Sequence, residues 1–311
     1  MGLDYNSSRI FALTLSRRAI DDVRRDGLHQ LRNYVDLCAF LAKHPLARTF
    51  FSYAQMVLEE PDTPYYTLTK RLIDTVSENT LCTVGVNFGF VSMLHGSKKL
   101  AEYAGQGRHV SWLTFTTDAD PELAASVEAG EDLGSFLWSI YVKGPVEANL
   151  LQLIAAHPQC TFQLTLHPEA LSEEIAVRLA ALPNVMPSIY LTEPCLTPAA
   201  KKAFSLLTQN HMLSAAFLWL DSVQASKAPE PGWLEELSDF TPVCVCSRKP
   251  GMTLQQSEDL RKQIWANRLH GNGRLFLIDL ESDLRAINQR LPDRVSCEVR
   301  PAMQADMPLC L

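Results

Sequence analysis

The chain has 311 residues, of which 47% are hydrophobic and 20% charged, and 28 Lys and Arg stand against 35 Asp and Glu for a formal net charge of −7. This acidic balance argues against a nucleic-acid groove, which needs clustered basic side chains. No stretch approaches the roughly 18 uninterrupted apolar residues of a membrane span. Residues 1–8 lack the apolar segment of a secretory signal, so we expect a cytoplasmic protein with no nucleic-acid and no membrane partner.

The first third of the chain is expected to be helical. Residues Ser16–Glu78 carry amphipathic stretches, and Pro45 should end one helix because it lacks the N–H needed to continue it. One expected helix ends at His44, and three more are expected over Thr49–Glu60, Tyr66–Val76 and Leu94–Tyr103. Thr80–Phe90 is apolar and glycine-punctuated, which fits either a strand or the start of a buried helix. We therefore assign residues 1–108 to a helical N-terminal segment.

A strand, a short polar turn and a helix then recur about every 25 to 30 residues, the pitch of a parallel βα repeat. The clearest copy runs from a strand at Thr161–Leu166 through a helix at Ile175–Leu182 to a strand at Met186–Thr192. The strands expected are Val110–Thr117, Phe136–Val142, Thr161–Leu166, Met186–Thr192, Leu213–Leu220, Pro242–Cys246 and Leu275–Leu280. The repeat predicts an α/β fold with a partial or full (β/α) barrel of parallel strands over residues 109–290.

The helices between these strands have recognisable starts. Thr197 followed by Pro198 fits an N-cap with proline at the first helical position. Further helices are expected over Pro145–Ile154 and Thr253–Leu269. Residues 291–311 show no clear period, so we expect a loop-rich C-terminal tail packed on the barrel.

Charged groups of both signs collect at the carboxyl ends of the expected strands, where parallel barrels hold their chemistry. The ligand-binding candidates at these ends are Asp118, Lys143, His167, Glu193, Asp221 and Arg248. Such a mouth suits a small polar or anionic ligand, or the end of a peptide. Surface loops are polar in most proteins, so each of these side chains also has an ordinary structural interpretation.

Metal binding is an alternative at the same ends. Two weak ligand sets are present, one with nitrogen and oxygen donors and one with thiols: His167, Glu193 and Asp221, and Cys195, Cys244 and Cys246. Cys244 and Cys246 share one face of a strand, a position where a buried free thiol is commoner than a metal ligand. The eight cysteines form no CxxC or CxxxCxxC motif, so we expect reduced thiols and no metal. GxSxG, HExxH, Walker and GxGxxG patterns are also missing.

One stretch carries a family resemblance. Residues 161–191 read Thr-Phe-Gln-Leu-Thr-Leu-His-Pro-Glu-Ala-Leu-Ser-Glu-Glu-Ile-Ala-Val-Arg-Leu-Ala-Ala-Leu-Pro-Asn-Val-Met-Pro-Ser-Ile-Tyr-Leu. This resembles the centre of radical SAM enzymes, which carry a strand ending in Thr-Asn-Gly, a helix of the type Ile-Asp-Glu-Glu-x-Ala-x-x-Leu, and then Gly-Asn-Val-x-Pro-Ala-Ile-Ser. Upstream, Val86–Tyr103 and the strand that starts at Val110 are similar to the lead-in of one branch of that superfamily. The resemblance covers about residues 65–285 and implies that family's barrel.

The departures from the family fall on its chemistry. Radical SAM enzymes place CxxxCxxC after the first strand, because three thiolates hold a [4Fe–4S] cluster that binds S-adenosylmethionine. Here no cysteine lies between Cys82 and Cys160. Three further cofactor positions also differ: the Gly-Gly-Glu-Pro turn is Val142-Lys143-Gly144-Pro145, the Asn-Gly turn is His167-Pro168, and the acid ending the fourth strand is replaced by Thr192 with Glu193 displaced by one.

These departures predict a cluster-less, radical-SAM-like pseudoenzyme that needs no cofactor and binds neither S-adenosylmethionine nor [4Fe–4S]. It would act as a binding or partner protein in a biosynthetic or maturation system, with an active radical SAM relative or a small polar ligand as its partner. The alternative is a repurposed non-radical enzyme in which the charged strand-end residues supply acid–base or anion-binding groups. A third interpretation, a cluster held by the thiol set above, is the weakest of the three.

Overall fold

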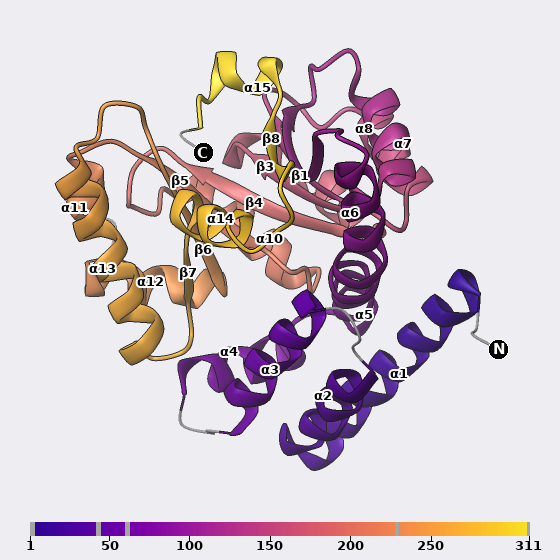
Figure 1. Ribbon diagram of the computed structural model, residues 1–311. Coiled ribbons are helices and arrows are strands. Elements are labelled where there is room, and N and C mark those ends of the chain that lie inside the picture. Colours follow the sequence, from indigo (N-terminus) through magenta and orange to yellow (C-terminus); the bar gives the residue numbers. More distant parts are fainter. Residues whose placement is uncertain (1–3, 42–44, 60–62, 228–229, 310–311) are drawn as a thin grey trace.

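The computed structural model describes residues 4–41, 45–59, 63–227 and 230–309 (Figure 1). Its centre is one sheet of eight parallel strands: β1 (Val110–Thr117), β2 (Leu137–Val142), β3 (Thr161–Leu166), β4 (Val185–Leu191), β5 (Ala215–Leu220), β6 (Val243–Arg248), β7 (Phe276–Asp279) and β8 (Val295–Val299). The strand order is β7-β6-β5-β4-β3-β2-β1-β8, so β7 and β8 are the two ends. The sheet curls into an open half-barrel (Figure 1), which confirms the predicted α/β fold in its partial-barrel form.

The first seven strands lie within two residues of their predicted bounds, but the expected loop-rich tail is wrong for residues 295–306. There the chain forms β8, which pairs in parallel with β1, and then α15 (Pro301–Asp306). Ser296 and Glu298 are exposed, whereas Val295 is buried against the sheet. This strand is five residues long and lies at an edge, so its apolar alternation is too brief to stand out in the sequence.

Helices that connect the strands cover one face of the sheet. They are α7 (Leu123–Leu133), α8 (Ala148–Ala156), the 3₁₀ turn η2 (Pro168–Ala170), α9 (Glu173–Ala180), α10 (Pro198–Gln209), α11 (Gln224–Lys227), α12 (Pro231–Phe240) and α13 (Leu254–His270). The helix α14 (Leu280–Asn288) packs on the opposite face instead. The predicted start of α10 is confirmed, because the Thr197 hydroxyl accepts the N–H of Ala200 at 3.1 Å and Pro198 is the first helical residue. The helices predicted over Pro145–Ile154, Ile175–Leu182 and Thr253–Leu269 correspond to α8, α9 and α13, whereas no bounds were predicted for α7 and α12.

The N-terminal third is helical, as predicted: α1 (Tyr5–Asp26), α2 (His29–Leu41), α3 (Pro45–Glu59), α4 (Pro64–Thr75), α5 (Glu78–Val86), the π-helix η1 (Asn87–Gly96) and α6 (Ser97–Gly105). The ambiguous segment at residues 80–90 is therefore helix rather than strand. The expected helix end at His44 lies outside the described residues, and Pro45 begins α3. Within the described ranges, no helix has the length and apolar character that a membrane crossing requires.

The two faces of the sheet have different cores. The helix-covered face holds aliphatic side chains such as Ile140, Leu164 and Leu218, which are fully buried. The opposite, concave face is more aromatic, and its cluster includes Phe115 and Phe217 together with side chains of α14 and of the segment after α15. The element α14 contacts β6 and β7 at one end of the sheet and β8 at the other. The concave face is thus partly covered by the last quarter of the chain.

Candidate functional site

The predicted ligand-binding residues lie at the carboxyl ends of six successive strands. They are Asp118 after β1, Lys143 after β2, His167 after β3, Glu193 in the turn after β4, Asp221 after β5 and Arg248 as the last residue of β6. In a parallel sheet these ends share one edge. The side chains nevertheless have different surroundings there, and two of the six take part in one contiguous group on the concave face.

Three ring side chains form the centre of that group. The hydroxyl of Tyr141 on β2 lies 2.8 Å from Nε2 of His167. The His167 ring is 5.1 Å from the ring of Tyr190 on β4 and 5.8 Å from that of Tyr141, both in edge-on geometry. All three are half-buried, and burial raises the pKa of the Tyr190 hydroxyl. Edge-on rings of this kind stabilise each other.

The group continues onto β5 and β6. Phe217 lies 6.4 Å from Tyr190, and two residues along the same strand Trp219 donates its indole N–H to the carbonyl of Arg248 at 3.2 Å. The ammonium of Lys249 lies 5.7 Å from the centre of the Trp219 ring and 3.8 Å from a carboxylate oxygen of Asp221. The indole ring is thereby fixed at its nitrogen and flanked by a cation.

The Asp221 carboxylate also organises the turn after β5. It accepts the N–H groups of Gln224 at 2.9 Å and of Val223 at 3.0 Å. The hydrogen bond from the Gln224 backbone is the largest cause that lowers the pKa of Asp221. The Gln224 side chain in turn accepts from Lys249 at 3.3 Å and donates to the carbonyl of Thr192 at 2.8 Å. This network links the ends of β4, β5 and β6 beside the rings.

A row of hydroxyl side chains crosses the same face of the sheet and includes Tyr141 of the ring group. Thr117, Tyr141, Thr165 and Ser188 are register partners across β1 to β4, and register partners in neighbouring strands point to the same side of a sheet. Gln163 donates to the Thr165 hydroxyl at 2.7 Å. Among the described residues, the buried hydroxyl oxygens of Thr117 and Ser188 have no hydrogen-bond partner, which is costly unless another group satisfies them.

The remaining candidates lie outside this group. A carboxylate oxygen of Asp118 accepts the backbone N–H of Lys143 at 3.1 Å, and the Lys143 and Glu193 side chains are exposed. The guanidinium of Arg248 is buried, with nitrogens 2.6 Å from the Asp279 carboxylate and 3.1 Å from that of Glu281. Burial raises the pKa of Glu281, although the hydrogen bonds from the Ser247 hydroxyl and the Arg248 backbone and the positive charge of Arg248 act to lower it. Arg248 is therefore committed to an internal ion cluster.

The cysteines predicted as weak metal ligands do not gather. Cys244 and Cys246 are buried in the core on the helix-covered face, whereas Cys195 is exposed in the turn after β4. A hydrogen bond with Cys246, followed by burial, raises the pKa of the Cys244 thiol, which disfavours the thiolate that binds metal. Within the described parts of the chain, no three His, Cys, Asp or Glu side chains form a cluster able to hold a metal ion.

The sequence alone did not single out Tyr141, Tyr190 or Trp219. Each lies in an apolar strand, where an aromatic residue is ordinarily a core residue. The sequence did contain one signal for this face, the alternation of side chains along a strand. Gln163, Thr165 and His167 are alternate residues along and just after β3, so they point to the same face, which must be partly polar. Extending that face across the sheet leads to Tyr141 and Tyr190 on either side of His167.

Two comparisons with known proteins gave no match. No protein-family model matches the sequence, and no curated protein matches it significantly. Function must therefore be inferred from the residues themselves.

Proposed function

We propose that this chain is a binding protein that holds a small planar ligand bearing an anionic group on its concave face, at the carboxyl ends of β2 to β6. The observation that carries the proposal is the half-buried ring group of Tyr141, His167 and Tyr190, which adjoins Trp219 and the ammonium of Lys249. Aromatic faces stack on flat ligands. A lysine and a histidine beside them favour a negative charge on the ligand.

The hydroxyl row supports the same site. The hydroxyls of Thr117 and Ser188 are buried and lack partners in the described chain, and a buried polar group is normally satisfied. Both oxygens are covered in the structure, so a ligand or an ordered water would provide the missing hydrogen bonds once neighbouring side chains move to admit it. The row thus supports a ligand with polar edges rather than a purely apolar one.

The proposal keeps the radical-SAM-like, cluster-less character predicted from the sequence. Its support is the half-barrel fold, together with the absence of cysteine between Cys82 and Cys160 from the sequence. A protein partner, such as an active radical SAM relative, is part of the same proposal. Exposed apolar side chains on α1 to α3 support a partner surface: Phe11 is 53%, Phe40 85% and Met56 57% exposed.

The ligand test uses three matched probes. Calorimetric titration with 4-hydroxybenzoate should give binding, whereas 4-hydroxybenzamide lacks the charge and cyclohexanecarboxylate lacks the aromatic ring, and both should bind more weakly. Trp219→Leu and Lys249→Gln should each weaken 4-hydroxybenzoate binding, whereas Trp265→Leu on α13, 44% exposed in the wild type, is the matched control. Saturation near 100 times Kd should add about 2.7 kcal/mol to the free energy of unfolding. Equal binding of the three probes would refute the site.

The partner test is affinity purification from the native host. The wild type should recover a stoichiometric protein that Phe40→Ser loses, since Phe40 is the most exposed of these apolar side chains. Repeated recovery of a bare monomer would count against a protein partner.

A second function, a non-radical enzyme, is favoured by the 2.8 Å contact between Tyr141 and His167. A hydroxyl held on an imidazole is suited to proton transfer or nucleophilic attack. An enzyme of this kind should hydrolyse 4-nitrophenyl acetate faster than buffer, with the rate lost in His167→Asn and its pH profile altered in Tyr141→Phe. A wild-type hydrolysis rate no higher than that of His167→Asn would exclude catalysis by the Tyr141–His167 pair.

A further inference from the structure

The last segment of the described chain covers part of the concave face. After α15 the chain turns back from the β8 end of the sheet toward β5 (Figure 1). Met303, Met307 and Leu309 are almost fully buried. They belong to the same apolar cluster as side chains of β4 and β5, among them Tyr190 of the ring group. We call residues 300–309 the C-terminal strap, since they share the concave core with the proposed ligand site.

A single residue supplies the polar attachment of the C-terminal strap. The guanidinium of Arg300 lies 2.7 Å from the carboxylate of Asp120 and 2.7 Å from that of Glu122. The backbone N–H of Arg300 donates to the carbonyl of Phe115 on β1 at 2.9 Å. Within the described chain, every hydrogen bond and ion pair from the strap to the rest of the protein starts at Arg300. The remainder of the strap is held by apolar packing.

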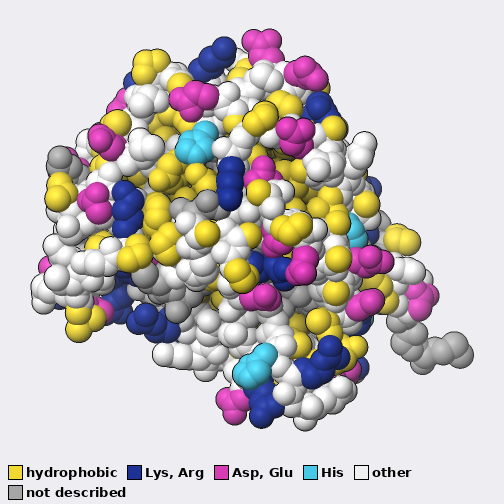
Figure 2. All heavy atoms as spheres, turned by 90° about the horizontal axis from the view of Figure 1, so that it is seen from above, with side chains coloured by type: hydrophobic (Ala, Val, Ile, Leu, Met, Phe, Trp, Pro, Cys, Tyr) yellow, Lys and Arg dark blue, Asp and Glu magenta, His cyan; other side chains and the backbone are white. Residues whose placement is uncertain are grey.

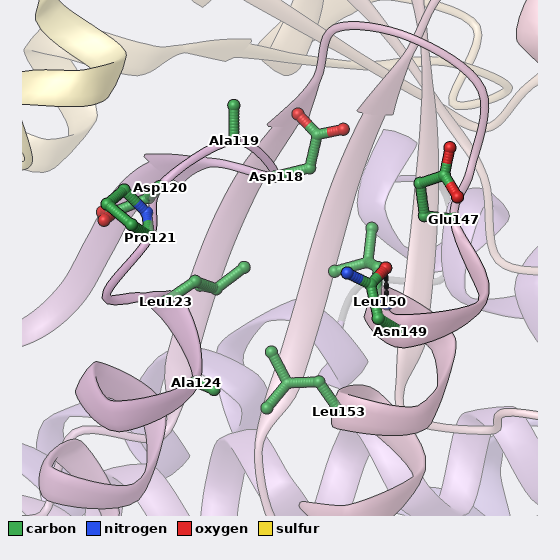
Figure 3. Close-up of a pocket in the computed structure, with 10 residues that line it drawn as sticks. All are labelled: Asp118, Ala119, Asp120, Pro121, Leu123, Ala124, Glu147, Asn149, Leu150 and Leu153. Atoms are coloured by element: carbon green, nitrogen blue, oxygen red, sulfur yellow. Dashed lines mark hydrogen bonds between the residues drawn. The ribbon is translucent and has the colours of Figure 1, made fainter.

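The carboxylate that receives Arg300 is held in place independently of the strap. Asp120 lies in the turn between β1 and α7 (Figure 3). Its carboxylate also accepts the hydroxyl of Thr116 at 2.8 Å and the backbone N–H of Glu122 at 3.0 Å. These bonds lie within the β1–α7 segment, so they do not need the strap. The turn can therefore release and recapture Arg300 without being rebuilt.

Buried hydroxyls on the concave face favour a state in which the strap is released. Thr117 on β1 and Ser188 on β4 are fully buried, and their hydroxyl oxygens have no partner among the described residues. Leaving a buried hydroxyl unpaired costs free energy, which water or a ligand recovers once the cover moves. Terminal segments with few attachments also open at a lower free-energy cost than core strands. The closed state is thus the one that leaves polar groups unsatisfied.

We propose that the C-terminal strap is a displaceable cover on the concave site, with Arg300 as its latch. Release of Arg300 from Asp120 carries the strap methionines out of the concave core and admits a ligand to the hydroxyl row. Strap and ligand compete for one face, so the apparent affinity falls with the fraction of molecules that are open. This inference rests on the proposed function, because the ligand that it admits is the planar anion of the concave site.

Hydrogen exchange of the full chain without ligand measures release of the strap. The bonded amides of Gln304 and Met307 should exchange together, and faster than those of β1 to β4. Arg300→Met should accelerate both about tenfold, since a hydrogen bond between charged groups is lost. Arg274→Met is the matched control, because Arg274 forms its ion pair just before β7, at the amino edge of the sheet. It should leave exchange of the strap unchanged.

A second variant removes the charge on the other side of the latch. Asp120→Asn keeps the shape of the side chain and should accelerate exchange of the strap by a similar factor, even if Arg300→Met does not fold. Exchange of the strap no faster than that of β1 to β4 would overturn the inference. So would an exchange rate that neither variant changes.

Calorimetric titration with 4-hydroxybenzoate connects the strap with the site. Affinity should rise by up to about tenfold in Arg300→Met and Asp120→Asn and keep its wild-type value in Arg274→Met. Saturating 4-hydroxybenzoate should in turn accelerate exchange of the wild-type strap, since the coupling is reciprocal. Equal affinity in all four proteins, or slower exchange on binding, would overturn this inference and leave the concave site standing. Absence of binding in every variant would instead refute the proposed ligand site, and this inference with it.

Discussion

Replacing Arg248 by methionine should expose the energetic cost of the ion cluster behind β6. The substitution preserves a long side chain but leaves the carboxylates of Asp279 and Glu281, 1% and 3% exposed, without a counter-charge. Removing one partner of a buried ion pair costs about 3–5 kcal/mol. Glu281 keeps the Ser247 hydroxyl at 2.6 Å and a backbone N–H at 2.9 Å, so we expect the lower end, about 3 kcal/mol. For 311 residues this lowers Tm by about 5 °C.

Urea unfolding at pH 7 and pH 5 measures this loss. Burial raises the folded-state pKa of Glu281 above its ordinary value, so the folded chain binds that proton more tightly than the unfolded chain does. The resulting stabilisation is complete below the unfolded pKa and is lost as pH rises through the folded pKa. Losing Arg248 raises this pKa further, so the deficit should shrink at pH 5. Neutralising the cluster with Arg248→Met, Asp279→Asn and Glu281→Gln together should recover most of the loss. A loss below about 1 kcal/mol at pH 7, or one that grows on acidification, would refute the argument.

Three further outcomes are expected. Gly134→Ala should cost about 2–4 kcal/mol in urea unfolding, because Gly134 has a φ of 98° and its added Cβ would lie 2.6 Å from the carbonyl oxygen of Gly96; a neutral effect would contradict the close approach. Burial opposes the ionisation of Asp120, but the hydrogen bonds from the backbone, Thr116 and Arg300 outweigh burial and lower the pKa of Asp120. The stabilisation that the ionised Asp120 adds is therefore present above the unfolded pKa and is lost as pH falls through the folded pKa. Arg300→Met should therefore destabilise at pH 7 and less at pH 3, and a pH-independent loss would exclude this linkage. Site-resolved alkylation should modify the exposed Cys195 before the buried thiols; early labelling of a buried one would refute the packing.

The fold was predictable because its signals are local and repeated. The exact bounds of Val110–Thr117 and Thr161–Leu166 follow from apolar runs between polar turns. The strand Val295–Val299 was missed because its assignment depends on pairing with β1, nearly two hundred residues earlier. A short edge strand is defined by its partner more than by its own residues. Whether the barrel closes is a long-range property of the same kind.

The candidate site was only half predictable. Counting strand ends located His167 and Asp221, because position after a parallel strand is a sequence property. It also selected Arg248, whose side chain turns to Asp279 and Glu281 instead. Those acids flank the start of α14, and their distance from β6 is fixed by tertiary packing. Trp219 went unnoticed because an aromatic in an apolar strand has the same pattern whether its ring is covered or half exposed.

The position of α14 connects these observations. Asp279 ends β7 and caps α14 by accepting the N–H of Ser282, so the chain turns from strand to helix without a loop. The helix then contacts β6 and β7 on one side and β8 on the other (Figure 1). Because α14 bridges the two ends of the sheet, a β7–β8 pairing that would complete the barrel is replaced by helix packing. The ion pair from Asp279 to Arg248 fastens this helix start to β6.

An open half-barrel also leaves part of its concave face uncovered. The segment after α15 packs in the concave core through Met307 and Leu309, yet Tyr190 and Trp219 remain half-exposed. Hydrophobic side chains gather in the middle of the face seen from above, with charged and histidine side chains among them (Figure 2). In a closed eight-stranded barrel the interior is filled by its own side chains. Here the part of the concave face that stays partly exposed is aromatic and charged, which is why we propose a ligand site at the carboxyl ends of β2 to β6 and not in a barrel centre.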